Sequence, residues 1–316
     1  MIVRWGLPEL PDALAEVGIA RPFVIASDRW RRLELPPHVG WWSRVPSEHV
    51  DVAGDADGIL AVGGGSAIDT AKHASAETGL PLVHVPTTYS GAEWTTFYGI
   101  RSPDRRMQGG GGGAHPVALV YDADLTLDLP RSETAGTALN ALAHCAEALY
   151  ASGRSPEGDE QALAGAPLIA SALPQVLARP RDPDARFELL RGAAHAGHAL
   201  ALAGLALSHA MAQALGGLYG APHGAMNALC LPPALAYNRD YAPNEVARFG
   251  EAIGGDAVGR TRELARLGGF ERLRDFGVPQ RDLSQVARAT AMRPGNQANP
   301  HPASPAEIEA MYESIW

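Results

Sequence analysis

Histidines and amide side chains at helical spacing are the first sign of chemistry in this 316-residue sequence. Asn140 and His144 lie four residues apart, as do His209 and Gln213, so each pair shares one face of an expected helix. His223 follows a short distance along the chain. Imidazoles that converge on one point could bind a divalent metal, which would polarise a carbonyl for hydride attack. A single helical histidine is more often a core residue, so spacing alone leaves both interpretations open.

A glycine-rich segment, AVGGGSAIDTAK, offers a second kind of chemistry in the first half of the chain. An apolar run enters three glycines and then a helix. Glycines let the backbone approach an anion, and a helix start directs N–H groups and a positive dipole end toward it. The alternative is an ordinary strand–turn–helix. If the loop binds a cofactor phosphate, the residues expected to hold it are Gly63, Gly64, Gly65 and Ser66, with Asp69 in the first helical turn.

Polar side chains also follow two other expected strands. Thr87, Thr88 and Ser90 come directly after one strand, and Asp28 after another. Ligands of open α/β sheets bind at the carboxyl ends of the strands. The hydroxyls would share the cofactor with the glycine loop. A carboxylate at Asp28 would accept hydrogen bonds from both ribose hydroxyls and repel a 2′-phosphate, which favours NAD over NADP. An ordinary polar turn and a solvated aspartate are the alternatives.

The elements that must position these residues differ between the two halves. Short apolar runs bounded by Gly, Pro or Asp predict buried strands at 22–26, 58–62, 81–86 and 116–121, with a helix at 66–79, and this alternation implies a parallel α/β sheet. After residue 130 strand-like runs almost vanish. Helices are predicted at 131–152, 157–178, 185–219, 224–237, 243–254, 257–276 and 280–292, followed by an irregular segment and a short final helix.

The domain boundary is therefore expected near 128–130, between an α/β dinucleotide-binding domain (1–128) and an all-α domain (129–316) that carries the substrate and metal site. Five consecutive glycines at 109–113 predict a loop or hairpin tip.

Composition narrows the classes of function. The net charge of −9 argues against nucleic acid as a partner, because phosphate binding needs a basic surface. Cys145 and Cys230 lie in apolar, helix-like surroundings, so a disulfide framework is not expected and a reducing cytoplasm is the simplest location. No signal peptide is visible at the start. The apolar window 192–217 contains three histidines and a glutamine, which favours a buried helix or helix pair over a membrane span.

Together these segments resemble the iron-containing (group III) alcohol dehydrogenase family, most closely its maleylacetate reductase branch. The matching segments run in family order along nearly the whole chain: AVGGGSAIDTAK, VPTTYSGAEWTTFYG, DADLTLDLP, ALNALAHCAEALYA, HAMAQALGGLYGAPHGAMNALCLPPALAYN and ANPHPASPAEIEAMYESIW. The resemblance implies the two domains above, an active site in the cleft between them, and a nicotinamide cofactor on the two loops and Asp28. Family members that use iron or zinc bind it through one aspartate and three histidines. Those positions are Asn140, His144, His209 and His223.

The sequence departs from the family pattern in three places. Asn140 replaces the aspartate, which removes a negative charge and weakens the metal site, as the maleylacetate reductase branch also tends to show. Gln213 stands where many members have another histidine, and glutamine cannot titrate. The region between Asp28 and Gly58 is compressed, which affects the adenine side of the cofactor site.

Three hypotheses follow. The first is an NADH-dependent reductase of a small carbonyl or enone substrate that carries a carboxylate, with His144, His209 and His223 as catalytic groups acting directly or through a metal. The second is a non-redox lyase or dehydratase of a biosynthetic pathway on the same scaffold. The third is a non-catalytic binding protein. For the enzyme we expect a small-molecule substrate, a cytoplasmic homodimer, and neither nucleic acid nor membrane as a partner.

Overall fold

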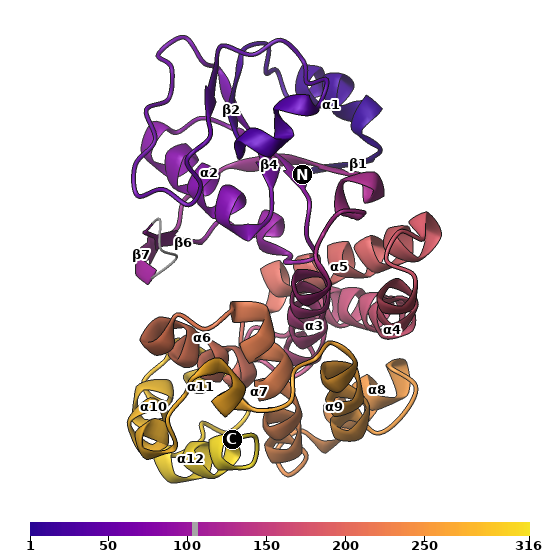
Figure 1. The fold of residues 1–316 in the computed structure, drawn as a ribbon, viewed down its shortest axis with the longest axis vertical. Helices are drawn as coiled ribbons and strands as arrows, with labels where there is room; N and C mark the ends of the chain where they lie inside the picture. Colours follow the sequence, from indigo (N-terminus) through magenta and orange to yellow (C-terminus); the bar gives the residue numbers. More distant parts are fainter. Residues whose placement is uncertain (103–106) are drawn as a thin grey trace. The chain divides into compact units, whose positions relative to one another are not determined.

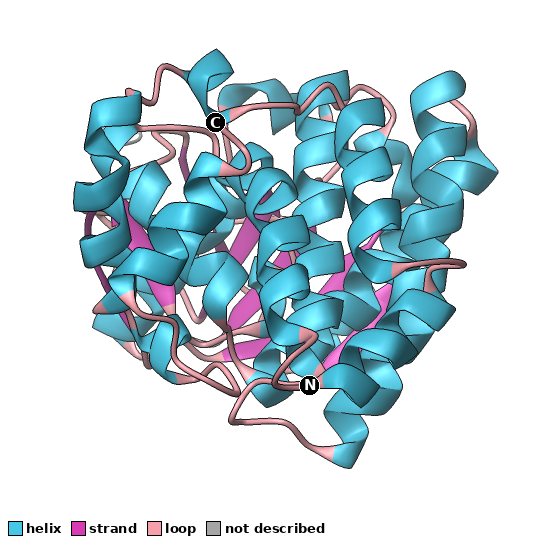
Figure 2. Ribbon diagram, turned by 90° about the horizontal axis from the view of Figure 1, so that it is seen from below, coloured by secondary structure: helices cyan, strands magenta, loops and turns pink. Residues whose placement is uncertain are grey.

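The computed structural model describes residues 1–102 and 107–316, and the chain divides into two compact units, Met1–Asp128 and Leu129–Trp316. Figure 1 labels their helices and strands, and Figure 2 distinguishes helices, strands and loops by colour. The first unit contains the strands of a parallel sheet, and the second is built from helices. This is the combination of α/β and all-α architecture that the sequence predicts.

The first unit is built on a six-stranded parallel sheet with strand order β1-β8-β5-β4-β2-β3. Its central strands are apolar and wholly buried, as expected for parallel strands covered on both faces. The six strands are β1 (Ile2–Trp5), β2 (Pro22–Ile25), β3 (Gly40–Trp42), β4 (Gly58–Gly63), β5 (Leu82–Pro86) and β8 (Pro116–Tyr121). All four predicted strands are present. The edge strands β1 and β3 escaped prediction because they are short and only partly buried.

Helices and a hairpin complete this unit. Its helices are α1 (Leu10–Glu16) and α2 (Gly65–Thr78), with 3-10 turns at Leu7–Glu9, Asp28–Arg32, Ala92–Trp94 and Ala123–Thr126. The antiparallel hairpin β6 (Tyr98–Arg101) and β7 (Met107–Gly111) lies beside α2 (Figure 1).

The expectation of a loop or hairpin tip at 109–113 is wrong for its first three glycines, which belong to β7. The neighbouring strand explains their presence there. A Cβ added at Gly110 would lie 2.8 Å from the backbone oxygen of Tyr98, and one at Gly111 would lie 2.8 Å from the Tyr98 hydroxyl. Glycine therefore lets the hairpin pack closely.

The second unit consists of ten α-helices among the residues described, with α3 packed against α4, α5 and α7. They are α3 (Arg131–Ala148), α4 (Pro156–Ala178), α5 (Pro183–Ala203), α6 (Leu207–Tyr219), α7 (His223–Asn238), α8 (Pro243–Ala252), α9 (Ala257–Leu267), α10 (Leu283–Ala291), α11 (Pro294–Gln297) and α12 (Pro305–Glu313). Shorter 3-10 turns occupy Leu273–Phe276 and Gln280–Asp282. Capping side chains fix several starts, including a capping box in which Ser304 and Glu307 bind each other's backbone at α12.

The helix predicted at 185–219 is two helices. Gly204, at φ 78°, ends α5 in a backbone conformation that favours glycine, and α6 continues at an angle of 98°. The apolar window 192–217 therefore forms a bent helix pair, the alternative that the sequence favours. On length and composition alone α4 could cross a membrane, but half of its apolar window is buried, as in the core helix of a helical domain.

Candidate active site

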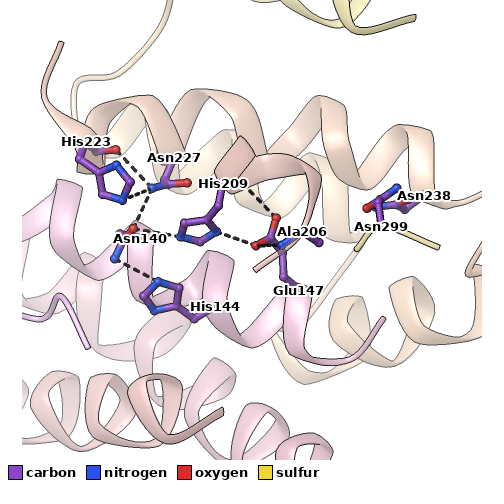
Figure 3. A network of polar contacts seen from close by, with 9 residues as sticks. All are labelled: Asn140, His144, Glu147, Ala206, His209, His223, Asn227, Asn238 and Asn299. Atoms are coloured by element: carbon purple, nitrogen blue, oxygen red, sulfur yellow. Dashed lines mark hydrogen bonds and ion pairs between the residues drawn. The ribbon is translucent and has the colours of Figure 1, made fainter. Parts of the chain in front are cut away.

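Three helices of the second unit bring the predicted catalytic histidines together. Asn140, His144 and Glu147 lie at successive turns on one face of α3, where Figure 3 shows them directed toward α6 and α7. His209 lies in the first turn of α6, and His223 is the first residue of α7. The α3 and α7 backbones pack directly through Gly136 and Gly224, whose lack of side chains permits this approach.

The three imidazoles form one continuous cluster. The His144 and His209 rings stack with centroids 4.7 Å apart, and the His209 and His223 centroids are 5.9 Å apart. His144 and His209 are 3% and 1% exposed, whereas His223 is only partly buried. The cluster is therefore reached from the His223 side.

Two amide side chains join the rings (Figure 3). Asn140 Nδ2 donates to His144 Nε2 at 3.4 Å, and Asn140 Oδ1 faces His209 Nε2 at 3.2 Å. Asn227, fully buried one turn after His223, donates through Nδ2 to Asn140 Oδ1 at 2.7 Å and lies 3.0 Å from His223 Nε2. Since an amide nitrogen only donates, Nε2 of His144 and Nε2 of His223 accept.

A buried carboxylate completes the cluster. Glu147 is wholly buried and accepts hydrogen bonds from His209 Nδ1 at 2.6 Å and from the backbone N–H groups of Ala206 and His209. Nδ1 of His209 therefore faces a buried carboxylate, and Nε2 faces the Asn140 amide oxygen. These two contacts fix the orientation of the ring.

His144 has the opposite character. Burial, followed by the charges of His209 and His223, holds the pKa of His144 well below its ordinary value. Its Nδ1 atom is buried without a hydrogen-bond partner. A lowered pKa favours the neutral form of His144, which suits a ring stacked on another imidazole.

The side chains do not fit the metal that the resemblance implies. Asn140 offers a neutral amide instead of a carboxylate, and the Asn227 amide nitrogen, a donor, lies against Asn140 Oδ1 and His223 Nε2. Over residues 1–102 and 107–316, no group of three or more His, Cys, Asp or Glu side chains has an arrangement that could hold a metal ion. Hydrogen bonds take the place of coordination here.

Gln213, one turn beyond His209 on α6, contacts an arginine. Arg293, directly before α11, donates to the Gln213 side-chain oxygen at 3.4 Å and to its backbone oxygen at 3.2 Å. Gln213, which stands where many family members have a further histidine, thus accepts hydrogen bonds from a cation.

In the first unit, the predicted cofactor residues follow three adjacent strands, β2, β4 and β5. The two loops meet closely. A Cβ added at Gly64 would lie 2.6 Å from Thr88 Cγ2, and the position of a Cβ at Gly65 is 3.8 Å from Ser90 Oγ. Gly63 has φ 153°, and a Cβ there would lie 2.7 Å from Ala67 Cβ. Gly63 and Gly64 therefore leave no room for a side chain, whereas a Cβ at Gly65 would make only an ordinary van der Waals contact.

Polar groups at this junction lack partners. The Thr87 and Thr88 hydroxyl oxygens are buried with no hydrogen-bond partner, and no side chain caps the start of α2. Ser66 lies inside the first turn of α2 after its N-cap, Gly64. A loop with unpartnered hydroxyls beside an uncapped helix start suits an anion.

Asp69 and Asp28 have other partners. The expectation that Asp69 lies in the first helical turn is wrong, because α2 begins at Gly65; its carboxylate lies 3.4 Å from the buried ammonium of Lys72. Asp28 begins the 3-10 turn after β2 and is largely exposed, with Arg31 Nε donating to it at 2.8 Å. That hydrogen bond lowers the pKa of the Asp28 carboxyl.

Two residues of the cluster, Glu147 and Asn227, were not predicted from the sequence. Glu147 lies three residues after His144, and Asn227 lies four residues after His223, so the helical spacing that revealed the histidines also carried these signals. What could not be seen was that both side chains turn inward and are buried.

Comparisons with known proteins agree with this architecture. The family described as "Fe-containing alcohol dehydrogenase family, C-terminal" matches residues 134–316, and "Iron-containing alcohol dehydrogenase" matches residues 48–123. Maleylacetate reductase 1 of Cupriavidus pinatubonensis is 33% identical over 321 residues, covering 96% of this chain and 90% of that protein.

Two further relatives agree. Maleylacetate reductase of Sphingobium indicum is 36% identical over 266 residues, which covers 82% of this chain and 75% of the relative. The crystal structure of maleylacetate reductase from Agrobacterium tumefaciens superposes with a TM-score of 0.89 at 29% identity, over 100% of this chain and 95% of that one. The chain thus belongs to the iron-containing alcohol dehydrogenase family and is an oxidoreductase, as the resemblance predicts.

Proposed function

We propose that this enzyme is an NADH-dependent reductase of a small carbonyl or enone substrate, of the maleylacetate reductase kind. The observation that carries this proposal is the match to maleylacetate reductases at 33–36% identity over most of the chain. The buried histidine cluster gives that reaction class a site able to stabilise a developing oxyanion. Nothing in the comparisons favours the alternative of a lyase or dehydratase.

The cofactor would be held at the carboxyl ends of β2, β4 and β5. Its pyrophosphate suits the glycine loop and the start of α2, where buried Thr87 and Thr88 hydroxyls lack partners. Gly63, Gly64, Gly65, Ser66 and Ser90 would line the same turn, with Asp69 orienting Lys72 behind it. Bound NADH would supply the hydride.

Asp28 would set the preference for NADH over NADPH. Its carboxylate is exposed at the end of β2 and is kept ionised by the hydrogen bond from Arg31. A carboxylate there accepts from ribose hydroxyls and repels a 2′-phosphate.

Three histidines would have distinct catalytic roles. His209, held in place by Glu147, would stabilise negative charge that develops on the substrate oxygen. The partly buried His223 lies at the accessible end of the cluster and would contact the substrate. His144, whose lowered pKa favours the neutral form, would support the stack of rings. Because the amides of Asn140 and Asn227 do not fit a metal, none of these roles passes through one.

We also propose a cytoplasmic homodimer. Both cysteines are buried free thiols whose pKa values burial raises, which suits a reducing compartment. Light scattering of the purified protein tests the dimer directly.

A substrate panel tests the proposed reaction. We expect the enzyme to consume NADH with maleylacetate, and to do so faster than with simple aldehydes. NADH binding without turnover on maleylacetate, 2-oxo acids or aldehydes would contradict the proposal and favour the non-redox alternative. No quenching of protein fluorescence by NADH would indicate a binding protein of another kind.

A further inference from the structure

Arg293 contacts Gln213 on α6, the helix that carries His209. Among the residues that the structure describes, no carboxylate forms an ion pair with it. Its hydrogen bonds are the two to the neutral acceptors of Gln213, at 3.2 and 3.4 Å, which are long for a guanidinium. The Nε atom is buried and has no hydrogen-bond partner at all.

The position of Arg293 relates it to the catalytic residues. Gln213 lies one helical turn after His209, so both share one face of α6. The next turn of this face ends at Gly217, and a Cβ there would lie 3.6 Å from Arg293 Nη2. Gln213 and Arg293 are both partly buried, as is His223, whereas His209 is closed off. Arg293 is therefore partly accessible and contacts the face of α6 that also carries His209.

We infer that Arg293 binds a carboxylate of the substrate and so selects carboxylated carbonyl compounds over uncharged ones. This inference rests on the proposed function. A planar guanidinium matches a carboxylate through two parallel N–H···O bonds, which a neutral amide cannot replace. Gln213 supports the role because it holds the guanidinium without neutralising it, whereas a glutamate there would cancel the charge.

Desolvation agrees with this role. Burial lowers the pKa of Arg293, which means that the folded protein holds this charge without full compensation. A bound anion would supply the missing compensation.

Kinetics with a charged and an uncharged substrate test the inference. Arg293→Gln and Arg293→Lys are compared with wild type on maleylacetate and on its dimethyl ester, with NADH saturating. We expect Arg293→Gln to raise KM for maleylacetate about 10- to 100-fold, the loss of one charge-assisted carboxylate contact, with a smaller change in kcat. Arg293→Lys should recover only part of the loss, because lysine cannot form the paired contact.

The ester and a matched arginine give the controls. Neither variant should change kcat/KM for the ester, and Arg288→Gln, at an exposed position on α10, should leave both substrates unaffected. An equal loss of kcat/KM on the acid and the ester would overturn the inference and indicate a structural role. Unchanged kcat/KM on both substrates would also overturn it. Thermal unfolding of each variant shows whether it is folded. If Arg293→Gln does not fold, the kinetics of Arg293→Lys on the acid and the ester test the inference instead.

A binding assay separates this inference from the proposed reaction. If the wild type reduces neither compound, the proposed function fails, and calorimetry with succinate then examines the site alone. Binding of succinate by wild type and its loss in Arg293→Gln would still support the inference. No binding of succinate by wild type would overturn it.

Discussion

Glu147 links the polar cluster to the electrostatics of the reaction. It is wholly buried, and its partners are His209 Nδ1 and two backbone N–H groups at the start of α6. A buried carboxylate that contacts one ring nitrogen fixes the orientation of the imidazole, as carboxylates behind many functional histidines do.

We expect Glu147→Gln to lower kcat by about 100-fold, because an amide no longer gives His209 the carboxylate contact that orients it toward the developing oxyanion. KM should change less. Steady-state kinetics measures the split, with Glu263→Gln, on the exposed surface of α9, as the control. An unchanged kcat in a folded Glu147→Gln protein would refute the role given to His209.

We propose that Asp28 determines the preference for NADH over NADPH. Three neighbouring arginines make a substitution of Asp28 a sensitive test of this role. Arg29, Arg31 and Arg32 lie in the same short 3-10 turn. Replacing Asp28 by Ser removes the carboxylate and leaves these cations available to a 2′-phosphate. The ratio of kcat/KM for NADPH to that for NADH should rise about 10-fold or more, the size of one charged contact. A ratio that stays constant would show that Asp28 does not contact the ribose.

At the scale of elements, the sequence predicted the strands and helices that are marked by a continuous run of one residue type. The four central strands are apolar runs, broken only by His84 in β5, and α2 begins at a run of three glycines, so composition alone located them. The division of 185–219 at Gly204 was missed because alanine and leucine continue on both sides. The β7 strand was missed because glycine disfavours strands, and only contact with Tyr98 explains it.

β5 carries an acid-sensitive group. His84 is wholly buried, both its ring nitrogens lack partners, and burial, with Lys72 nearby, holds its pKa well below the ordinary value. The unfolded chain binds a proton at this residue near pH ~6.5, whereas the folded chain does not, so stability is full above that pH and falls as the pH drops below it. Thermal unfolding at about pH 7.5 and about pH 5.5 measures this loss.

We expect His84→Leu to reduce the difference between the two unfolding midpoints, because it removes the proton taken up on unfolding. His49→Leu, at an exposed site, is the control. A variant whose midpoint falls as steeply as that of wild type would show that another group causes the acid sensitivity.

The cofactor loop gives a further test at this scale. A Cβ at Gly64 would press on Thr88 and narrow the junction between the two loops. Gly64→Ala should therefore weaken NADH binding by about 10-fold, roughly one lost hydrogen bond to a charged group, without unfolding the protein. Fluorescence titration measures the affinity, and Gly54→Ala, where nothing lies within 4 Å of a Cβ, is the control. If Gly64→Ala and wild type bind NADH with equal affinity, this loop does not contact the cofactor.

At the scale of the whole molecule, sequence indicated the architecture better than the site's chemistry. The change from apolar runs to helical patterns near Leu129 is visible in composition, since each half has its own periodicity. The convergence of Asn140, Glu147 and Asn227 on the histidines depends on how three helices pack, which residue spacing does not specify.

This account predicts that the enzyme works without a bound metal. The Asn227 amide nitrogen donates to Asn140 Oδ1 and lies against His223 Nε2, the two atoms that would have to face a metal ion. Dialysis against EDTA should leave kcat unchanged, and added Fe²⁺ or Zn²⁺ should not raise it. Loss of activity on dialysis with recovery on adding either metal would contradict the hydrogen-bonded description of the cluster.

The central claim is net hydride transfer from NADH to the substrate. Incubation of the enzyme with maleylacetate and NADH that carries deuterium at the transferring position of C4, followed by mass spectrometry, tests it most directly. The account predicts a reduced product that contains one carbon-bound deuterium, together with one equivalent of NAD⁺. A product that forms without deuterium, while NADH is left intact, would contradict it.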